Sequence, residues 1–118
     1  MQFMEVKLRE KNLINKLVAL WERSVRATHL FLSEAEILQI KEYVPQALAE
    51  IPVLVVAYDE NEQPAVFMGI AERKLEMLFV DDNMRGQGIG KQLVELAFAK
   101  YNVNEVTVNE QNPQAQAF

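Results

Sequence analysis

The chain has 118 residues, half of them hydrophobic, which is enough for one compact domain with its own core. Twelve basic and seventeen acidic residues give a net charge of −5, which argues against a general affinity for nucleic acid and is compatible with a cationic substrate. The sequence has no cysteine and a single histidine, His29, so we expect neither a disulfide nor a metal site. The sequence lacks a membrane-helix or signal-peptide pattern, so we expect a cytoplasmic protein with a single domain over residues 1–118.

The N-terminal part of the chain predicts a strand followed by a helix. In the stretch FMEVKL, residues 3–8, the side chains alternate in the manner of a strand. Over residues 13–27 the apolar residues recur at spacings of three and four, whereas Glu22 and Arg26 fall on the opposite side. This segment is therefore predicted to be an amphipathic helix, with an apolar stripe of Leu13, Leu17, Leu20, Trp21 and Val25.

A second helix is predicted to begin after Ser33. Ser33 and Glu36 have the spacing of a capping box, in which each residue's side chain bonds to the other's backbone N–H. The apolar stripe continues to Leu48, but Pro45 lies inside it. Because proline interrupts helical hydrogen bonding, we expect a kink or a break into two short helices there.

The middle of the chain predicts three strands. The run VLVVAY, residues 53–58, is apolar throughout, as expected for a strand buried on both faces, and the polar turn DENEQP follows it. The stretches AVFMGIA, residues 65–71, and KLEMLFV, residues 74–80, are two further strands around the turn-like ERK.

The C-terminal part predicts a helix, a strand and a final helix. Apolar residues spread over a wide arc of the helix at 88–101, which suggests that its sheet covers most of it. EVTV, residues 105–108, is a strand, and Asn112 with Pro113 is typical of a helix start. The predicted order is β-α-α-β-β-β-α-β-α, an α/β fold with a mixed sheet flanked by helices.

Gly86, Gly88 and Gly90 alternate directly before the helix at 88–101. A helix N-terminus offers unpaired N–H groups and the positive end of the helix dipole, and glycines let the backbone approach a phosphate closely. Arg85 and Lys91 flank the glycines and could add charged contacts. The stretch RGQGIGK therefore predicts a phosphate or pyrophosphate site, with an ordinary glycine-rich turn as the alternative.

Two common phosphate loops do not fit this stretch. A P-loop requires G-x-x-x-x-G-K-[ST], and the first position of that pattern is Arg85 here. The dinucleotide fingerprint requires a third glycine or an alanine where this sequence has Lys91 or Leu93. Arg85, Gly88 and Gly90 instead fit the pattern [Q/R]-x-x-G-x-[G/A].

Three separated stretches resemble motifs of one family, and they occur in the same order as in that family. EMLFVDDNMRGQGIGKQLVELA looks like the acetyl-CoA-binding motif of the GNAT superfamily of N-acetyltransferases, and VTVNEQNPQAQAF resembles the family motif that follows it. LWERSVRATHLFLS resembles the corresponding helix of bacterial YjaB-like members. The resemblance implies a GNAT-like sheet and transfer of an acetyl group from acetyl-CoA to a primary amine of a small molecule or protein, by direct attack in a ternary complex and without a metal.

The resemblance also implies which residues bind acetyl-CoA. The strand before the loop would hydrogen-bond the pantetheine arm, with a backbone N–H near Leu78 polarising the thioester carbonyl. The loop amides would hold the pyrophosphate, and two asparagines would approach from the next strand and helix. The residues are Leu78, Phe79 and Val80 for the arm, Arg85, Gly86, Gln87, Gly88, Ile89, Gly90 and Lys91 for the pyrophosphate, and the asparagines Asn109 and Asn112.

The acceptor amine must lose a proton before it attacks, and Glu76 is the best candidate base. The two-residue alternation of a strand predicts that Glu76 shares a face with Leu78 and Val80. A solvent-facing or structurally paired glutamate is the alternative. His29 could also take up a proton, or pack structurally at a helix end. We assign it to substrate binding in a pocket with Trp21, Arg26 and Phe31.

The sequence ends at Phe118, where members of this family usually continue with a tyrosine and two more strands. That tyrosine protonates the departing CoA thiolate. We therefore expect a C-terminally incomplete domain without the last two family strands and without the general acid. A noncatalytic acyl-CoA-binding module, or a fragment that forms a homodimer through the strand at 105–108, is the alternative to an active enzyme.

Overall fold

The computed structural model describes residues 2–28, 32–81, 84 and 87–106. The elements in chain order are β1 (Gln2–Glu5), α1 (Lys11–Thr28), α2 (Glu34–Lys41), α3 (Val44–Glu50), β2 (Val53–Tyr58), β3 (Pro64–Ala71), β4 (Lys74–Val80), α4 (Ile89–Lys100) and β5 (Glu105–Val106). The predicted order is confirmed as far as β5. The helix predicted to start at Asn112 lies outside the described residues.

The strands of the described residues form one sheet in the order β1-β2-β3-β4-β5. The first four strands pair antiparallel with their neighbours, whereas β5 runs parallel to β4. The prediction of a mixed sheet is therefore confirmed. In this sheet β5 is an edge strand, and it pairs with Lys74 and Leu75 at the beginning of β4.

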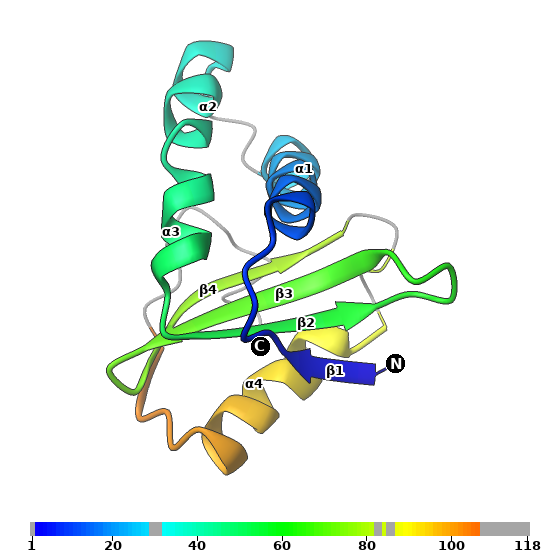
Figure 1. Ribbon diagram of the computed structural model, residues 1–118, viewed down its shortest axis with the longest axis vertical. Coiled ribbons are helices and arrows are strands. Elements are labelled where there is room, and N and C mark those ends of the chain that lie inside the picture. The colour runs from blue at the N-terminus through cyan, green and yellow to red at the C-terminus, as the bar shows by residue number, and fades with distance from the viewer. Residues whose placement is uncertain (1, 29–31, 82–83, 85–86, 107–118) are drawn as a thin grey trace.

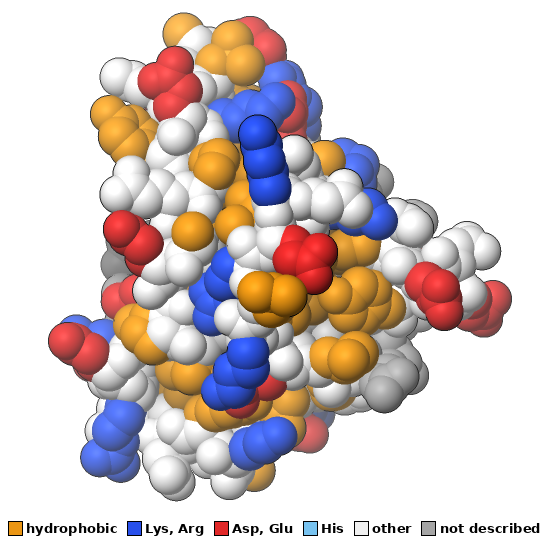
Figure 2. Space-filling model, in the orientation of Figure 1, with side chains coloured by type: hydrophobic (Ala, Val, Ile, Leu, Met, Phe, Trp, Pro, Cys, Tyr) orange, Lys and Arg blue, Asp and Glu red, His pale blue; other side chains and the backbone are white. Residues whose placement is uncertain are grey.

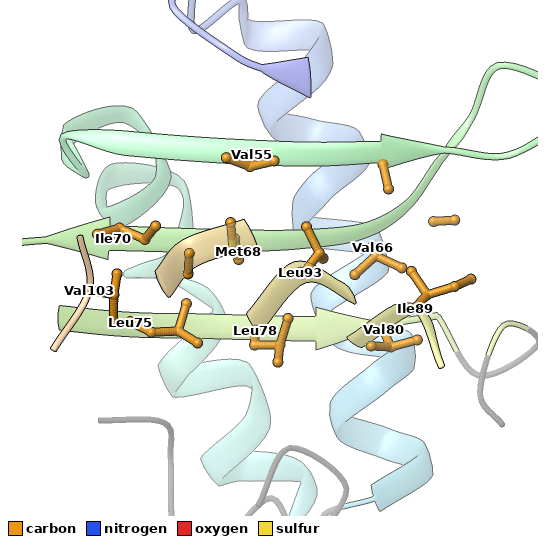
Figure 3. Packing of buried hydrophobic residues seen from close by; sticks show 13 residues of the cluster. Val55, Val66, Met68, Ile70, Leu75, Leu78, Val80, Ile89, Leu93 and Val103 are labelled. Carbon is orange, nitrogen blue, oxygen red and sulfur yellow. The ribbon is translucent and has the colours of Figure 1, made fainter. Parts of the chain in front are cut away.

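Helices cover both faces of the sheet (Figure 1): α1, α2 and α3 lie over one face, and α4 lies over the other. Successive side chains of a strand point to opposite faces, so a strand between two helical layers needs an apolar residue at nearly every position. In β2, Leu54 and Val56 belong to the cluster under α1, and Val55 belongs to the cluster against α4. Figure 3 shows Val55, Met68 and Leu78 of three strands beside α4.

Local signals set the helix boundaries as predicted. The Ser33 Oγ accepts from the backbone N–H of Glu36 at 3.2 Å, and the Glu36 carboxylate accepts from the Ser33 N–H at 3.0 Å, so the capping box is confirmed. The break near Pro45 is confirmed as well, because α2 ends at Lys41 and Pro45 lies in the first turn of α3. Proline is tolerated there because the first amides of a helix have no intrahelical acceptor.

Two expectations differ from the structure. The first strand ends at Glu5 rather than at residue 8, because Lys7 and Leu8 are exposed where the chain turns toward α1. The broad apolar arc of α4 is only partly covered: Leu93 and Ala97 are buried, whereas Phe98 is 49% exposed. A straight helix touches a sheet along one stripe, so residues more than about 100° away from that stripe remain in solvent.

Tyr101 ties the end of α4 to the edge strand β1. Its hydroxyl donates to the Glu5 carboxylate at 2.7 Å, and Lys7 also pairs with that carboxylate. Lys7 and Tyr101 hold the pKa of Glu5 below its ordinary value, while burial and Glu5 raise the pKa of Tyr101 to about 12.

We predict that Tyr101→Phe lowers the free energy of unfolding at pH 8 by about 1–2 kcal/mol, measured by urea denaturation.

The pH dependence has a definite sign. The folded-state pKa of Tyr101 lies above its ordinary value of 10, so the stabilisation is complete below pH 10 and is lost as the pH rises from 10 toward 12. The difference between the wild type and Tyr101→Phe should therefore shrink over that range. Tyr43→Phe is the control, because Tyr43 is 68% exposed. An equal loss of stability in both variants would contradict this account.

The turn between β3 and β4 uses two residues that are unfavourable there. Glu72 has φ 51° and Arg73 has φ 65°, in the left-handed region that favours asparagine and glycine in hairpin turns. Glu72→Asn should therefore raise the free energy of unfolding by about 0.5–1 kcal/mol. Glu60→Asn removes the same charge from the β2–β3 hairpin, at a position that is not among the residues with positive φ, and should leave the urea midpoint unchanged. A stabilisation shared by both variants would assign the effect to charge.

Candidate functional site

The N-terminus of α4 has the geometry of an anion site. Gly88 precedes the helix with φ 74° and ψ 11°, and its carbonyl accepts the backbone N–H of Gln92 at 3.1 Å. Gly88 provides no side-chain cap, so the amides of the first turn point out of the helix without an intrahelical acceptor. Lys91 is exposed in the same turn and adds a positive charge to that of the helix dipole.

The other residues predicted for the phosphate loop fall into two groups. Gln87 is exposed, whereas the side chain of Ile89 is buried in the cluster between α4 and the sheet, so only its backbone is available to a ligand. Gly90 is buried in the first turn of α4. Arg85, Gly86, Asn109 and Asn112 lie outside the described residues.

The residues predicted for the pantetheine arm lie in the second half of β4. Leu78 and Val80 are buried against α4, and Phe79 packs in the cluster under α1. The side chains of Leu78 and Val80 therefore belong to the core, and only the backbone of these two residues could contact a ligand. The side chain of Phe79 is partly buried and lines a pocket on the other face of the sheet. As far as it is described, β5 pairs with Lys74 and Leu75 at the start of β4, and residues 107 and 108 of the predicted strand lie outside the described residues.

A β-bulge in β4 overturns the face predicted for Glu76. Gly69 pairs with Met77 and Ile70 pairs with Leu75, which leaves Glu76 as an extra residue in β4. Strict alternation would place Glu76 beside Leu78, against α4. The bulge instead buries Leu75 on the side of α4 and lets Glu76 line a pocket on the opposite face.

That pocket has a volume of about 210 Å³ and lies between the sheet and the helices α1, α2 and α3. Trp21 of α1, itself 5% exposed, lines it together with Glu76, so the structure brings two of the predicted site residues together. The remaining lining is apolar and consists of Ile40, Val44, Ala47, Phe67, Met77 and Phe79. Glu76 is the ionisable side chain among these residues, and it is exposed, as the alternative of a solvent-facing glutamate predicts. A carboxylate at the edge of such a pocket can attract an ammonium group and accept its proton.

Arg26 is not among the described residues that line this pocket. Five helical positions separate it from Trp21, which is about 140° around a helix axis. Its guanidinium pairs with Glu22 and Glu34, and Lys41 of α2 pairs with the same Glu22. Figure 2 shows basic and acidic side chains beside one another at the top of the molecule, where α1 and α2 lie.

These ion pairs connect α1 to α2 at the surface. Lys41 and Arg26 hold the pKa of Glu22 below its ordinary value, and Arg26 does the same for Glu34. The assignment of Arg26 to substrate binding is therefore not supported by its position. His29 and Phe31, the other two residues assigned to the acceptor pocket, lie outside the described residues.

A larger pocket, of about 550 Å³, was not predicted from the sequence. It lies between the β2–β3 turn and the first turn of α4, and its walls are Tyr58, Asp59, Glu60, Asn61, Met84, Gln87, Ile89 and Gln92. Burial raises the pKa of Tyr58. The Asp59 carboxylate accepts the N–H groups of Asn61 and Gln63, which orders the turn. In the sequence, the acidic stretch DENEQP is the one signal that could have indicated this pocket.

Among the described residues, neither a helix able to cross a bilayer nor a cluster of three or more potential metal-binding side chains occurs.

Comparisons with known proteins assign the family. Residues 17–118 match the acetyltransferase (GNAT) domain. The chain is 46% identical over 103 residues to the peptidyl-lysine N-acetyltransferase YjaB of Salmonella typhimurium, and the match spans 87% of this chain and 70% of that protein. Against YjaB of Escherichia coli the identity is 43% over 103 residues, with 87% of this chain and 69% of that protein covered.

Solved structures agree with these sequence matches. The solution structure of apo-form YjaB from Escherichia coli matches with a TM-score of 0.78 and 38% identity, over all of this chain and 79% of that one. The PaiA N-acetyltransferase of Thermoplasma acidophilum, solved in complex with coenzyme A, has a TM-score of 0.71 and 19% identity, over all of this chain and 86% of that one. At that identity the second match concerns the fold alone. The family match and the two YjaB sequences place this chain in the GNAT acetyltransferase family.

Proposed function

We propose that this chain transfers an acetyl group from acetyl-CoA to a primary amine, and that the acceptor is a lysine side chain. The observation that carries the proposal is the pocket in which the Glu76 carboxylate joins Trp21 and an apolar wall. A lysine side chain has an apolar stem and a charged tip, and such a pocket complements both. The name of the YjaB relatives, peptidyl-lysine N-acetyltransferase, supports this choice of acceptor.

The N-terminus of α4 fits the diphosphate of the coenzyme. Apart from its two chain neighbours, no atom of the described residues lies within 4 Å of a Cβ atom added to Gly88, which supports an open space for a ligand in front of this residue. The amides of the first turn, which have no acceptor within the helix, and the exposed Lys91 favour an anion at that place. The backbone of the second half of β4, at Leu78, Phe79 and Val80, is the proposed contact for the pantetheine arm.

Acetyl-CoA supplies an acetyl group activated as a thioester, and the chain's own residues prepare the amine. Glu76 takes up a proton of the acceptor ammonium, directly or through one water, so that the nitrogen lone pair can form the new bond to the carbonyl carbon. A backbone N–H near Leu78 stabilises the negative charge that develops on the carbonyl oxygen. The bond to sulfur then breaks, the nitrogen gives up its second proton to water, and the thiolate takes up a proton from water as CoA leaves.

The test is the rate of CoA thiol release from acetyl-CoA in the presence of a lysine-containing peptide. We predict that Glu76→Gln lowers kcat by roughly 10²- to 10⁴-fold at neutral pH, because the variant cannot accept the proton. The deficit should shrink as the pH rises and the amine loses its proton unaided. The affinity for acetyl-CoA, measured by calorimetry, should remain that of the wild type.

Glu72→Gln is the matched control, because Glu72 is an exposed residue of the turn before β4. It should release CoA at the wild-type rate. If Glu76→Gln shows wild-type rates across the pH range, Glu76 is not the base. If the wild type binds acetyl-CoA and releases thiol with another primary amine but not with the lysine peptide, lysine is not the acceptor. If it binds acetyl-CoA but releases thiol with no amine, the chain is a noncatalytic acyl-CoA-binding module.

Gly88 tests the coenzyme site separately. Gly88→Ala forces a side chain into a left-handed backbone conformation, which should lower the free energy of unfolding by about 1–2 kcal/mol. We predict that the same change weakens acetyl-CoA binding by about tenfold or more, because the added methyl group displaces the phosphate from the amides.

Gly88→Asn separates the two effects, since asparagine tolerates this conformation better than alanine. Its stability should be close to that of the wild type, whereas its acetyl-CoA affinity should fall as in Gly88→Ala. Recovery of the affinity in Gly88→Asn would show that the conformation, and not a close approach of the ligand, requires the glycine.

A further inference from the structure

Asp81 is the first residue after β4, and an arginine of α1 holds its carboxylate. The Arg23 Nη2 donates to one carboxylate oxygen at 2.9 Å, and the Nε donates to the other at 3.4 Å. The Asp81 side chain is 16% exposed and that of Arg23 is 51% exposed. A two-point contact between a guanidinium and a carboxylate sets the orientation of both groups, which a lysine in place of the arginine could not do.

The backbone of Asp81 is held as well. Its N–H donates to the Ala65 carbonyl of β3 at 2.8 Å, and its carbonyl accepts the N–H of Met84 at 2.9 Å. Met84 packs against the same cluster as the buried Ile89 in the first turn of α4. Asp81 is therefore a fixed point between the end of β4 and the N-terminus of α4.

The ion pair joins the two halves of the proposed site. Helix α1 contributes Trp21 to the acceptor pocket, and Arg23 lies two residues further along the same helix. Residues two apart on a helix point to different sides, so α1 can line the pocket with one residue and hold Asp81 with the other. Because the ion pair is exposed, it contributes little to overall stability. We therefore ask whether it fixes the position of the chain instead.

We propose that Arg23 is a positioning residue for the diphosphate of the coenzyme. It acts through Asp81, by holding the chain where it leaves β4 for the N-terminus of α4. This inference rests on the proposed use of acetyl-CoA. It goes beyond that proposal because it assigns a role in coenzyme binding to Arg23, a residue of the helix that lines the acceptor pocket. Arg23 lies 58 positions before Asp81 in the sequence.

The experiment compares two acetyl donors by calorimetry, acetyl-CoA and S-acetylpantetheine, which lacks the diphosphate. Arg23→Ala should weaken acetyl-CoA binding by roughly three- to fivefold and leave S-acetylpantetheine binding unchanged. Arg23→Lys should recover part of the loss, because it keeps the charge without the two-point contact. Asp81→Ala should show a similar loss, and the double variant should be no weaker than either single variant.

Lys16→Ala is the matched control, because it removes one exposed positive charge from the same helix. It should bind both donors as the wild type does. Wild-type affinity of Arg23→Ala for acetyl-CoA, or equal weakening toward both donors, would overturn the inference, since equal weakening indicates a general structural effect. If the wild type itself does not bind acetyl-CoA, the proposed function fails instead.

Discussion

The bulge in β4 is the feature on which the candidate site depends. Leu75 and Leu78 are both buried against α4, although strict alternation would place them on opposite faces of the sheet. The extra residue, Glu76, resolves this conflict. Burial of Leu75, which is fully shielded, contributes about 2 kcal/mol and favours the bulge over a regular strand. As a consequence the carboxylate of Glu76 lies in the wall of the pocket that contains Trp21.

The opposite wall of that pocket depends on a contact from the start of the chain. Arg9 lies before α1, and its Nη1 donates to the Leu48 carbonyl near the end of α3 at 2.7 Å, while its Nε donates to the Val6 carbonyl at 3.1 Å. Burial lowers the pKa of Arg9. Because basic groups satisfy the last carbonyls of a helix, this arginine holds α3 against the sheet. Val44 and Ala47 of α3 then line the pocket.

Features with a local physical cause could be predicted from the sequence. The capping box at Ser33, the helix break at Pro45 and the strands between residues 53 and 80 depend on hydrogen bonds and side-chain periods within a few residues of one another. Gly88 belongs to the same group, because its left-handed conformation is a requirement of the turn itself. The position of Arg26 does not support its assignment to the acceptor pocket, and the helical period had already placed Arg26 on the side opposite the apolar stripe that contains Trp21.

The sequence by itself determined the order of the elements, the glycine-rich start of α4 and the family, because each of these follows from neighbouring residues or from motifs that can be compared directly. Only the tertiary structure decided which side of the sheet Glu76 faces and which partners hold Asp81 and Tyr101. Arg23 and Asp81 are 58 positions apart, and Glu5 and Tyr101 are 96 positions apart. Such contacts, like the bulge, arise from packing both faces of one sheet at once, and no local pattern contains that constraint.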